Sequence, residues 1–428
     1  MDRLVVFVGF LAAVIAVMSL FQWRLTRAYR RWVGSAIDEP KRRRWLAAGT
    51  SVLVAFNVTV VLRFFLGELG GYGHPLSQAL VVYPSGIFIG ALTFGFLLVT
   101  LLDLGQLAGR ALRVLVGWFA PKARAAHRSA SRKEAEYSRG RRRFLRLSGA
   151  SAIAAIGATP VFGSVTTARD YQLNRVPLRF PDLPQELEGF AIAQISDLHS
   201  GVFMTEENMR EIFELANSMS PNLTVITGDL VDNSDSQIPD LYRAAEVLKA
   251  DYGIYACLGN HDHYATADKV SAAMEQRGIT MLTNDRRRIT LDGAAFELIG
   301  IDDAGRGSRN FARLDDALRG VDPESLKVLL SHRPDIFPMV KSRDIDLMLS
   351  GHTHGGQVGI EVLGVDLNPV YLLHRYARGL YSEDGKYVYV NVGVGMVGAP
   401  IRFVRPEISL IILHRGDQAG ASGVRPSL

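Results

Sequence analysis

Residues 223–232 read LTVITGDLVD, a run of branched and mostly apolar residues that ends in Gly228-Asp229. β-Branched residues favour strands, and a short run of them bounded by glycine is typical of a buried strand. The same pattern, an apolar run followed by a polar cluster, recurs along the second half of the chain. It predicts strands over residues 191–196, 223–227, 253–258, 327–330, 345–349 and 387–392.

Amphipathic segments separate these strands. One begins after Thr205, a residue suited to the N-cap position, with Glu206 and Glu207 in its first turn. Another covers residues 266–277, and Gly278 suits the left-handed position that ends a helix. Strands alternating with helices are typical of an α/β domain.

A polar cluster follows five of the predicted strands. The clusters are Asp197-Leu198-His199, Gly228-Asp229-Leu230-Val231-Asp232, Gly259-Asn260-His261-Asp262, Ser331-His332 and Gly351-His352-Thr353-His354-Gly355-Gly356. Functional groups of open α/β sheets gather at the carboxyl ends of strands, so these side chains are expected to meet. Each cluster alone could be an ordinary cap or turn. Together they supply carboxylate, amide and imidazole ligands without cysteine, which suits Mn, Fe or Zn and argues against a closed structural zinc site.

In this order the clusters resemble the signature of the calcineurin-like metallophosphoesterase superfamily: Asp-x-His, Gly-Asp-x-x-Asp, Gly-Asn-His-Asp, a lone His, and Gly-His-x-His. The resemblance covers residues 190–413 and implies an αββα sandwich. Within the superfamily, the stretches DLHSG, GNHDH and GHTHGGQ are most similar to a bacterial membrane-associated branch. That branch includes enzymes that act on lipid-linked or envelope phosphodiesters.

The resemblance also implies a ligand set and a mechanism. One divalent ion (Mn, Fe or Zn) would be bound by Asp197, His199, Asp229 and His354, and a second by Asp229, Asn260, His332 and His352. A hydroxide bridging the two ions would hydrolyse a phosphomonoester or phosphodiester. His261 would protonate the leaving oxygen, and Asp262 would orient His261.

Other residues near these motifs carry weaker expectations. A glycine directly precedes three of the ligands, at Gly228, Gly259 and Gly351, where a side chain would obstruct the turn or the approach of phosphate. Asp232 is expected to support a ligand histidine. The acids expected at the surface are Asp302, Asp303 and Asp335, and the arginines expected to be solvated, with phosphate contact as the alternative, are Arg333, Arg375, Arg378, Arg402 and Arg405. Residues 391–400 are expected to form a close-packed turn near the mouth of the site.

The first half of the chain has a different composition. Apolar runs over residues 5–23, 45–65 and 79–102 each approach the length that crosses a bilayer, so residues 1–106 are predicted to form a membrane domain with three transmembrane helices. Residues 24–44 and 107–146 are densely basic, whereas residues 67–78 contain no lysine or arginine. The positive-inside bias therefore places both basic linkers in the cytoplasm.

The segment RRRFLR at residues 141–146 resembles a twin-arginine export signal, followed by a small-residue stretch over 147–168. That stretch is interpreted as the signal's apolar region or as a fourth transmembrane anchor, and we expect it to remain uncleaved. Residues 169–189 are a linker, residues 190–413 the catalytic domain, and residues 414–428 a flexible tail. Both interpretations predict a multi-pass protein of a bacterial-type cell membrane with an extracytoplasmic catalytic domain.

Charge and cysteine content exclude some functions. The chain has 48 lysines and arginines against 43 acidic residues, a net charge of +5, and the excess lies mainly before residue 170. Because these arginines flank apolar segments and are not interleaved with aromatic residues, no nucleic-acid partner is expected. The lone Cys257 allows no internal disulfide. The predicted partners are a membrane and a phosphoester substrate, lipid-linked ones included; the alternative function is a membrane sensor or scaffold with a structural metal site.

Overall fold

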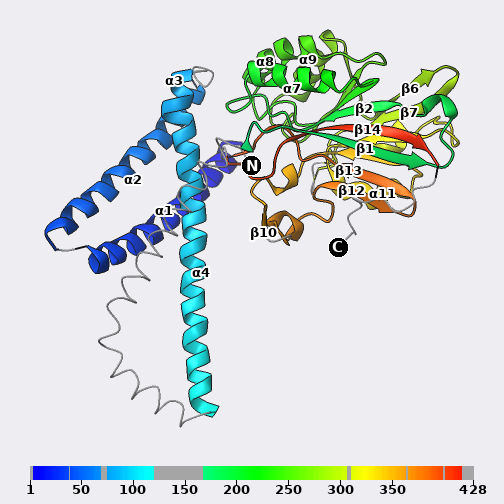
Figure 1. The fold of residues 1–428 in the computed structure, drawn as a ribbon. Helices are drawn as coiled ribbons and strands as arrows, with labels where there is room; N and C mark the ends of the chain where they lie inside the picture. Colours follow the sequence, from blue (N-terminus) through cyan, green and yellow to red (C-terminus); the bar gives the residue numbers. More distant parts are fainter. Residues whose placement is uncertain are drawn as a thin grey trace. The chain divides into compact units, whose positions relative to one another are not determined.

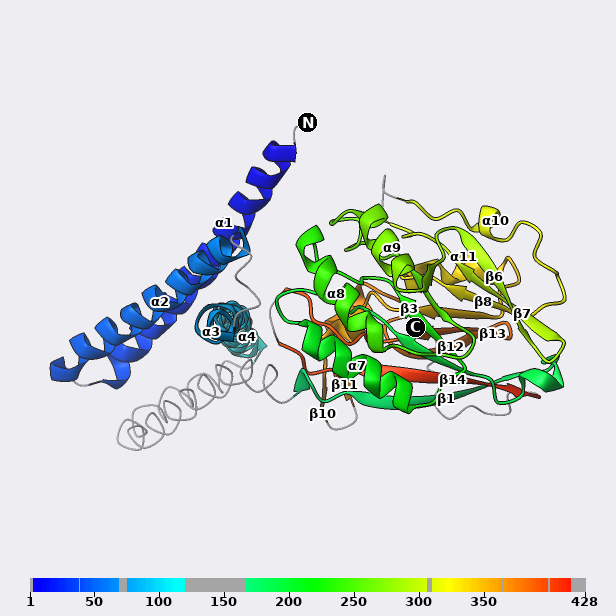
Figure 2. The same ribbon diagram turned by 90° about the horizontal axis from the view of Figure 1, so that it is seen from above.

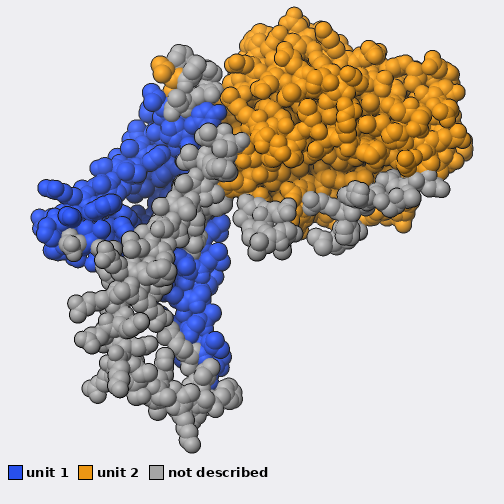
Figure 3. All heavy atoms as spheres, in the orientation of Figure 1, with its two compact units in different colours: residues 1–65, 79–162 blue, residues 66–78, 163–428 orange. Residues whose placement is uncertain are grey.

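The computed structural model describes residues 3–37, 39–68, 75–119, 167–305, 310–362, 365–398 and 401–416. The chain divides into two compact units, one made of residues 1–65 and 79–162 and the other of residues 66–78 and 163–428 (Figure 3). Each unit is described by itself.

The first unit is helical. Its long helices are α1 (Arg3–Ala36), α2 (Glu39–Glu68) and α4 (Tyr83–Phe119) (Figure 1). The short α3 (Pro75–Ser77), which is assigned to the second unit, and a π-helical turn, Gln78–Val82, precede α4 in the chain. Helices α1 and α4 pack through stacked Phe21 and Phe96, whose ring centroids are 4.1 Å apart. An ion pair at 3.0 Å joins Arg24 to Asp103 beside them.

Two helical segments of the described residues are apolar and long enough to cross a membrane. They are Glu39–Arg63, with a mean hydropathy of 1.9, and Leu80–Leu112, with a mean hydropathy of 2.2. They contain most of the predicted spans over 45–65 and 79–102. The third predicted span, over residues 5–23, lies within α1 and stays a prediction.

The twin-arginine-like segment 141–146 lies outside the described residues, as do most of the basic linker and nearly all of the predicted anchor over 147–168. Helix α4 continues to Phe119, so the first part of the predicted linker 107–146 is helical. The tail after residue 416 is also outside the described part.

The catalytic unit is built on two mixed six-stranded sheets (Figures 1 and 2). The first sheet runs in the order β1 (Gln172–Phe180), β14 (Glu407–Arg415), β2 (Ala191–Ile195), β3 (Leu223–Thr227), β4 (Ile254–Cys257), β5 (Ile279–Met281). The second runs β12 (Gly379–Glu383), β13 (Lys386–Val390), β9 (Leu347–Ser350), β8 (Lys327–Leu330), β7 (Ala294–Gly300), β6 (Asp285–Leu291). The stretches β2-β3-β4-β5 and β7-β8-β9-β13 are parallel. A small hairpin of β10 (Ile360–Val362) and β11 (Val365–Leu367) stands apart.

Buried side chains show four layers. Helices α7 (Glu206–Ser218), α8 (Ile238–Ala244) and α9 (Ala267–Gln276) pack on the outer face of the first sheet, where Ile212 and Phe213 meet Ile195. A second core, with Ile192 and Leu349, fills the space between the sheets. On the outer face of the second sheet lie α10 (Leu314–Ala317) and α11 (Phe337–Lys341). The αββα prediction is confirmed.

Alternation along the central strands explains why the sheets pair. In β2, Ala193 and Ile195 face the helices while Ile192 faces the other sheet, and every residue of the strand is buried. Strands covered on both faces read as continuous apolar runs, as this one does. Short 3₁₀ segments complete the unit: η4 (Gln185–Leu187), η5 (Asp235–Gln237), η6 (Ala245–Val247), η7 (Pro334–Ile336), η8 (His354–Gly356) and η9 (Pro369–Leu372).

Candidate metal centre

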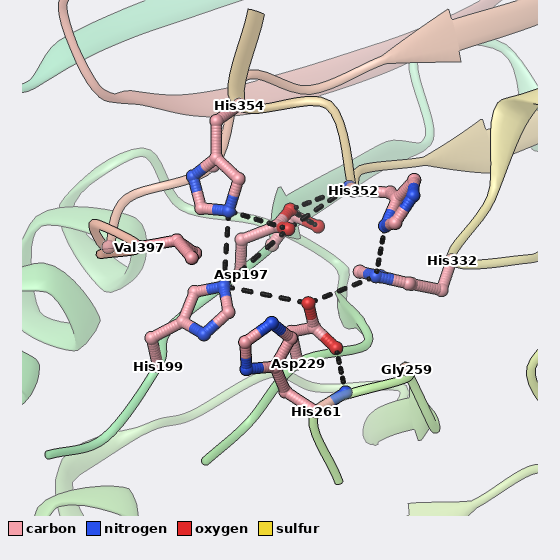
Figure 4. A network of polar contacts seen from close by, with 12 residues as sticks. Asp197, His199, Asp229, Gly259, His261, His332, His352, His354 and Val397 are labelled. Carbon is pink, nitrogen blue, oxygen red and sulfur yellow. Dashed lines mark hydrogen bonds and ion pairs between the residues drawn. The ribbon is translucent and has the colours of Figure 1, made fainter. Parts of the chain in front are cut away.

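The seven predicted metal ligands follow strand ends at one edge of the two sheets, and six of them, all but Asn260, are labelled together in Figure 4. Each follows the carboxyl end of a parallel strand: Asp197 and His199 follow β2, Asp229 follows β3, Asn260 follows β4, His332 follows β8, and His352 and His354 follow β9. The first sheet therefore contributes four of these residues and the second contributes three. Neither sheet holds a complete site, so their face-to-face packing assembles it.

The loops that carry the ligands have unusual backbones. Five of the seven ligands adopt positive φ angles: Asp197 (53°), His199 (49°), Asp229 (52°), His352 (71°) and His354 (51°). Residues other than glycine rarely adopt this region, and such conformations gather at functional sites. The surrounding structure therefore holds these side chains in positions that an unconstrained chain would avoid.

Two glycines make the close approach of the loops possible. A Cβ atom at Gly351 would overlap Ser196 Oγ and the Asp197 carboxylate. At Gly259 it would overlap the carboxylate and backbone nitrogen of Asp229. The prediction that a side chain would obstruct these turns is confirmed. The atoms that an added Cβ would overlap belong to the predicted ligands Asp197 and Asp229 or to Ser196, which contacts Asp197.

Nitrogen and oxygen atoms of one group of ligands face one another at short range. The Nε2 atoms of His199 and His354 are 3.1 Å apart, and Asp197 Oδ1 lies 3.3 Å from His354 Nε2. Asp229 Oδ2 is 3.5 Å from His199 Nε2. Imidazole nitrogens and carboxylate oxygens placed in this way fit a divalent cation among them.

A second group shares the same Asp229 atom. Its Oδ2 lies 3.1 Å from His332 Nε2, and His332 Nε2 lies 3.1 Å from His352 Nδ1. The Nδ1 atom of His332 is 2.9 Å from the carbonyl oxygen of Thr227, so its proton is held there and Nε2 is the nitrogen turned toward Asp229 and His352. The buried Oδ1 of Asn260 has no hydrogen-bond partner within the described structure. A buried acceptor without a partner fits a role as a ligand of a cation.

Burial and charge set the ionisation of the site. Burial would lower the pKa of His332, but the carboxylate of Asp229 outweighs it and raises the pKa to about 10. The pKa values of His352 and His354 are held well below the usual range by burial. Burial raises the pKa of Asp197, with the charge of Asp229 adding to it. Carboxylates gathered in a buried site need positive charge nearby, which divalent ions would supply.

Comparison with known proteins shows the family to which the chain belongs. The family model described as calcineurin-like phosphoesterase matches residues 190–356. An uncharacterized metallophosphoesterase of Bacillus subtilis, YkuE, is 32% identical over 290 residues, which cover 64% of this chain and 97% of that protein. The chain belongs to the calcineurin-like phosphoesterase family. It is therefore a metal-dependent phosphoester hydrolase.

Relatives of this phosphoesterase are found beyond bacteria. A zebrafish (Danio rerio) protein named transmembrane protein with metallophosphoesterase domain is 28% identical over 428 residues, 96% of this chain and 89% of that protein. A cattle (Bos taurus) protein of the same name is 31% identical over 289 residues, 64% of each chain. Both names describe those relatives as transmembrane proteins, and this chain has two helical segments that are apolar and long enough to cross a membrane.

The phosphoesterase places His261 at the edge of the ligand cluster. Its backbone nitrogen donates to Asp229 Oδ1 at 2.8 Å, which leaves Oδ2 to face both ligand groups. Its ring lies against Asp232, with Nδ1 contacting the carbonyl oxygen and standing 3.4 Å from Oδ1. Burial would lower the pKa of His261, but Asp232 and the charge of Asp229 raise it to about 9.

Asp262 was expected to orient the ring of His261, but its carboxylate makes other contacts. Its carboxylate accepts from the backbone nitrogens of Leu230 (2.9 Å), Val231 (3.1 Å) and Gly259 (2.8 Å). These bonds tie together the loops after β3 and β4. The carboxylate that lies beside the His261 ring is that of Asp232, which also stands 3.5 Å from His199 Nδ1. The prediction that Asp232 supports a ligand histidine agrees with this contact.

Two of the acids expected at the surface are buried. Asp302 is 8% exposed and Asp303 is 3% exposed. Asp302 Oδ1 lies 2.7 Å from His263 Nε2, and Asp303 Oδ1 accepts from Arg333 Nε at 2.7 Å. The expectation was wrong because both residues follow β7, next to the loop after β8 that carries His332.

The surface expectation also fails for two arginines. Arg333 is mostly buried, and its Nη1 lies 2.8 Å from His352 Nε2. Its place directly after His332 was the only signal in the sequence. Arg402 is fully buried and donates to the carbonyl oxygens of Val392 (2.6 Å), Gly393 (2.8 Å) and Val404 (2.7 Å).

Three other arginines pair with carboxylates. Arg375, Arg378 and Arg405 lie 3.0 Å, 2.6 Å and 2.7 Å from Glu383, Asp366 and Asp170 respectively. Residues 391–398 do pack beside the site, as expected: Val394 and Gly395 donate backbone bonds to Ser196 and Asp197. Val397 stands next to His199 and His354 in Figure 4.

Proposed function

We propose that this chain is a membrane-anchored phosphoesterase that binds two divalent ions and hydrolyses phosphodiester or phosphomonoester bonds of lipid-linked substrates. The observation that supports it most directly is the position of Asp229 Oδ2, which faces His199 Nε2 on one side and His332 Nε2 on the other. One carboxylate oxygen shared by two ligand groups is the arrangement that two ions sharing a ligand require.

Two bound divalent ions would activate a water molecule and polarise the phosphoryl oxygens. The chain's own residues do the rest. Buried Asp197 and Asp229 set the position of the ions, and His261 donates a proton to the leaving oxygen. Because Nδ1 of His261 is held at the carbonyl oxygen of Asp232, Nε2 is the atom left for that proton.

Lipid-linked substrates are proposed because the chain carries its own membrane segments. A catalytic domain tethered to a bilayer meets amphiphilic phosphoesters at high effective concentration without any added contact. The two apolar helical segments, Glu39–Arg63 and Leu80–Leu112, support the tether.

The two-ion site is tested on the full chain in detergent. Two quantities are measured: its metal content, and its rates of hydrolysis of bis(p-nitrophenyl) phosphate and p-nitrophenyl phosphate in parallel. Wild type with Mn²⁺ or Zn²⁺ should turn over at least one ester, and chelator should abolish the reaction. Asp229→Asn should lose both ions and all turnover, because an amide oxygen cannot bridge two cations.

Asp292→Asn is the matched control. Asp292 also has a positive φ, 49°, which asparagine tolerates, and it is exposed in the turn between β6 and β7. That variant should retain metal and turnover. Retained turnover in Asp229→Asn would contradict the two-ion mechanism, and bound metal without turnover of either ester would favour the sensor or scaffold.

A further inference from the structure

Two adjacent leucines stand almost fully in solvent on the catalytic unit. Leu372 is 87% exposed and Leu373 is 70% exposed. The other exposed large apolar side chains described within residues 167–416 reach at most 54%, the value of Tyr264. The nearest comparison is Leu80 and Leu101, both 66% exposed in the segment apolar enough to cross a membrane. The leucine pair is thus more exposed than these leucines of the candidate membrane segment.

This exposure belongs to a well-fixed turn. The pair ends and follows η9, which the buried Asn368 caps by accepting from the backbone nitrogen of Val370 at 3.1 Å. The backbone nitrogens of Leu373 and His374 both lie 2.9 Å from the carbonyl oxygen of Val370. The turn therefore presents its leucines in one defined position.

The turn is fastened to the metal centre on both sides. Asn368 Nδ2 donates to the carbonyl oxygen of Gly355 at 2.6 Å, one residue after His354. After the leucines, the ring of His374 lies 5.7 Å from the ring of His352, at an interplanar angle of 82°. The leucine pair is therefore part of the rim of the metal centre.

Charge around the leucine pair is balanced. Three basic side chains follow it, and each meets a carboxylate. The pairs are His374 with Asp335 at 3.0 Å, Arg375 with Glu383 at 3.0 Å, and Arg378 with Asp366 at 2.6 Å. A surface whose arginines are already paired has little attraction for an acidic peptide or a nucleic acid, and its apolar atoms remain as the feature to be recognised.

We propose that the Leu372–Leu373 turn enters the interfacial region of the bilayer and positions the metal centre against the headgroup plane. Stable protein interfaces bury about 800 Å² on each partner, more than two leucines offer to a free protein. A bilayer held close by the chain's own helices needs only a weak contact. The substrate is then an amphiphilic phosphoester whose acyl or alkyl chain stays in the membrane, an assignment that rests on the proposed function.

The bilayer contact is tested without catalysis, because Cys257 is fully buried and leaves an introduced cysteine as the accessible thiol. Leu372→Cys is labelled with an environment-sensitive fluorophore in the full chain, in vesicles of phosphatidylcholine and phosphatidylglycerol. Met339→Cys, 44% exposed on α11, is the matched control. The Leu372 label should be quenched by acyl-chain spin labels and the Met339 label by aqueous iodide. Iodide quenching of both, without acyl-chain quenching, overturns the proposal.

The substrate class is tested with two esters that share a leaving group, methyl p-nitrophenyl phosphate in water and hexadecyl p-nitrophenyl phosphate in the same vesicles. Wild type should prefer the long-chain ester. The double variant Leu372→Ser/Leu373→Ser should lose about tenfold of that preference, which corresponds to about 1.4 kcal/mol, and Met339→Ser should keep it. Equal use of both esters by wild type overturns the substrate assignment, whereas turnover of neither with metal bound contradicts the proposed function itself.

Discussion

His261 differs from the ligands around it in exposure. Its side chain is 17% exposed, whereas that of His199 is 1% exposed. A proton donor must reach the substrate, and its ring must not be bound to a metal ion. We expect His261→Gln to retain its metal content while hydrolysis slows by about 100-fold to 10,000-fold, the contribution of a general acid.

The leaving group provides the control for this prediction. An ester with a good leaving group needs little protonation, so p-nitrophenyl esters should be slowed less than alkyl esters in the His261→Gln variant. Measurement of both rates beside the metal content checks it. Loss of metal in this variant would mean that His261 is a ligand.

His263 gives a prediction for pH. Its Nε2 lies 2.7 Å from Asp302 Oδ1 and its ring stacks on Phe311 at 4.3 Å. The hydrogen bond to Asp302 raises the pKa of His263 above its usual value. A raised folded-state pKa means that this stabilisation is fully present below the unfolded value of about 6.5 and is lost as pH rises through the folded value.

A comparison of wild type with His263→Gln checks the direction in which this stabilisation changes with pH. In chelator at pH 6, the free energy of unfolding of wild type should exceed that of the variant by on the order of 0.5 to 1 kcal/mol, the range for a partly solvated pair, so wild type should unfold at the higher temperature. The difference should shrink toward pH 9. A difference that grows with pH would contradict the assignment of a protonated His263 beside Asp302.

At the scale of elements, the segment from Val392 to Gly395 follows β13 of the second sheet and packs against the loop after β2 of the first sheet, which carries Asp197. Its backbone donates to Ser196 and Asp197, and its carbonyl oxygens accept from the buried Arg402. Burial lowers the pKa of Arg402 to about 10, so the guanidinium is still charged at neutral pH. The side chain therefore holds this segment in place by hydrogen bonds inside the protein and does not face a substrate.

Replacement of Arg402 should lower the stability of the fold. Arg402→Met would leave several buried carbonyl oxygens unsatisfied, at about 1 to 3 kcal/mol each, so we expect a loss of at least about 2 kcal/mol of stability. Faster labelling of the buried Cys257 thiol would report it. Arg405→Met is the control, because Arg405 is exposed in an ion pair with Asp170 and exposed pairs contribute little. Equal labelling rates in the two variants would refute this role for Arg402.

For the whole molecule, the orientation of the catalytic unit remains a prediction from the distribution of arginines. The basic linkers should be cytoplasmic, and a crossing after residue 146 should place the catalytic unit outside. Enzyme reporters fused after Leu428, one active only in the cytoplasm and one active only outside it, test this directly. Activity of the cytoplasmic reporter alone would reverse the predicted topology.

The candidate ligands could be proposed from the sequence because each follows the end of a buried parallel strand. Asp229 after residues 223–227 and His332 after residues 327–330 stand where an apolar run stops, and that pattern is local. The αββα fold was implied by the same motifs. The strand β6, DRRRITL, is among those that were not predicted, since it begins with consecutive charged residues, lies at the edge of its sheet and lacks the apolar run of a covered strand.

Tertiary structure decided which polar residues are buried and what they touch. Asp302, Asp303 and Arg402 look like loop residues in the sequence, yet the packing of two sheets encloses them. Asp262 follows His261 in the chain, but the loop turns its carboxylate toward backbone nitrogens and brings Asp232, from the preceding strand's loop, to the His261 ring. Sequence patterns report periodicity along one element, whereas burial and side-chain partners depend on contacts between elements far apart in the chain.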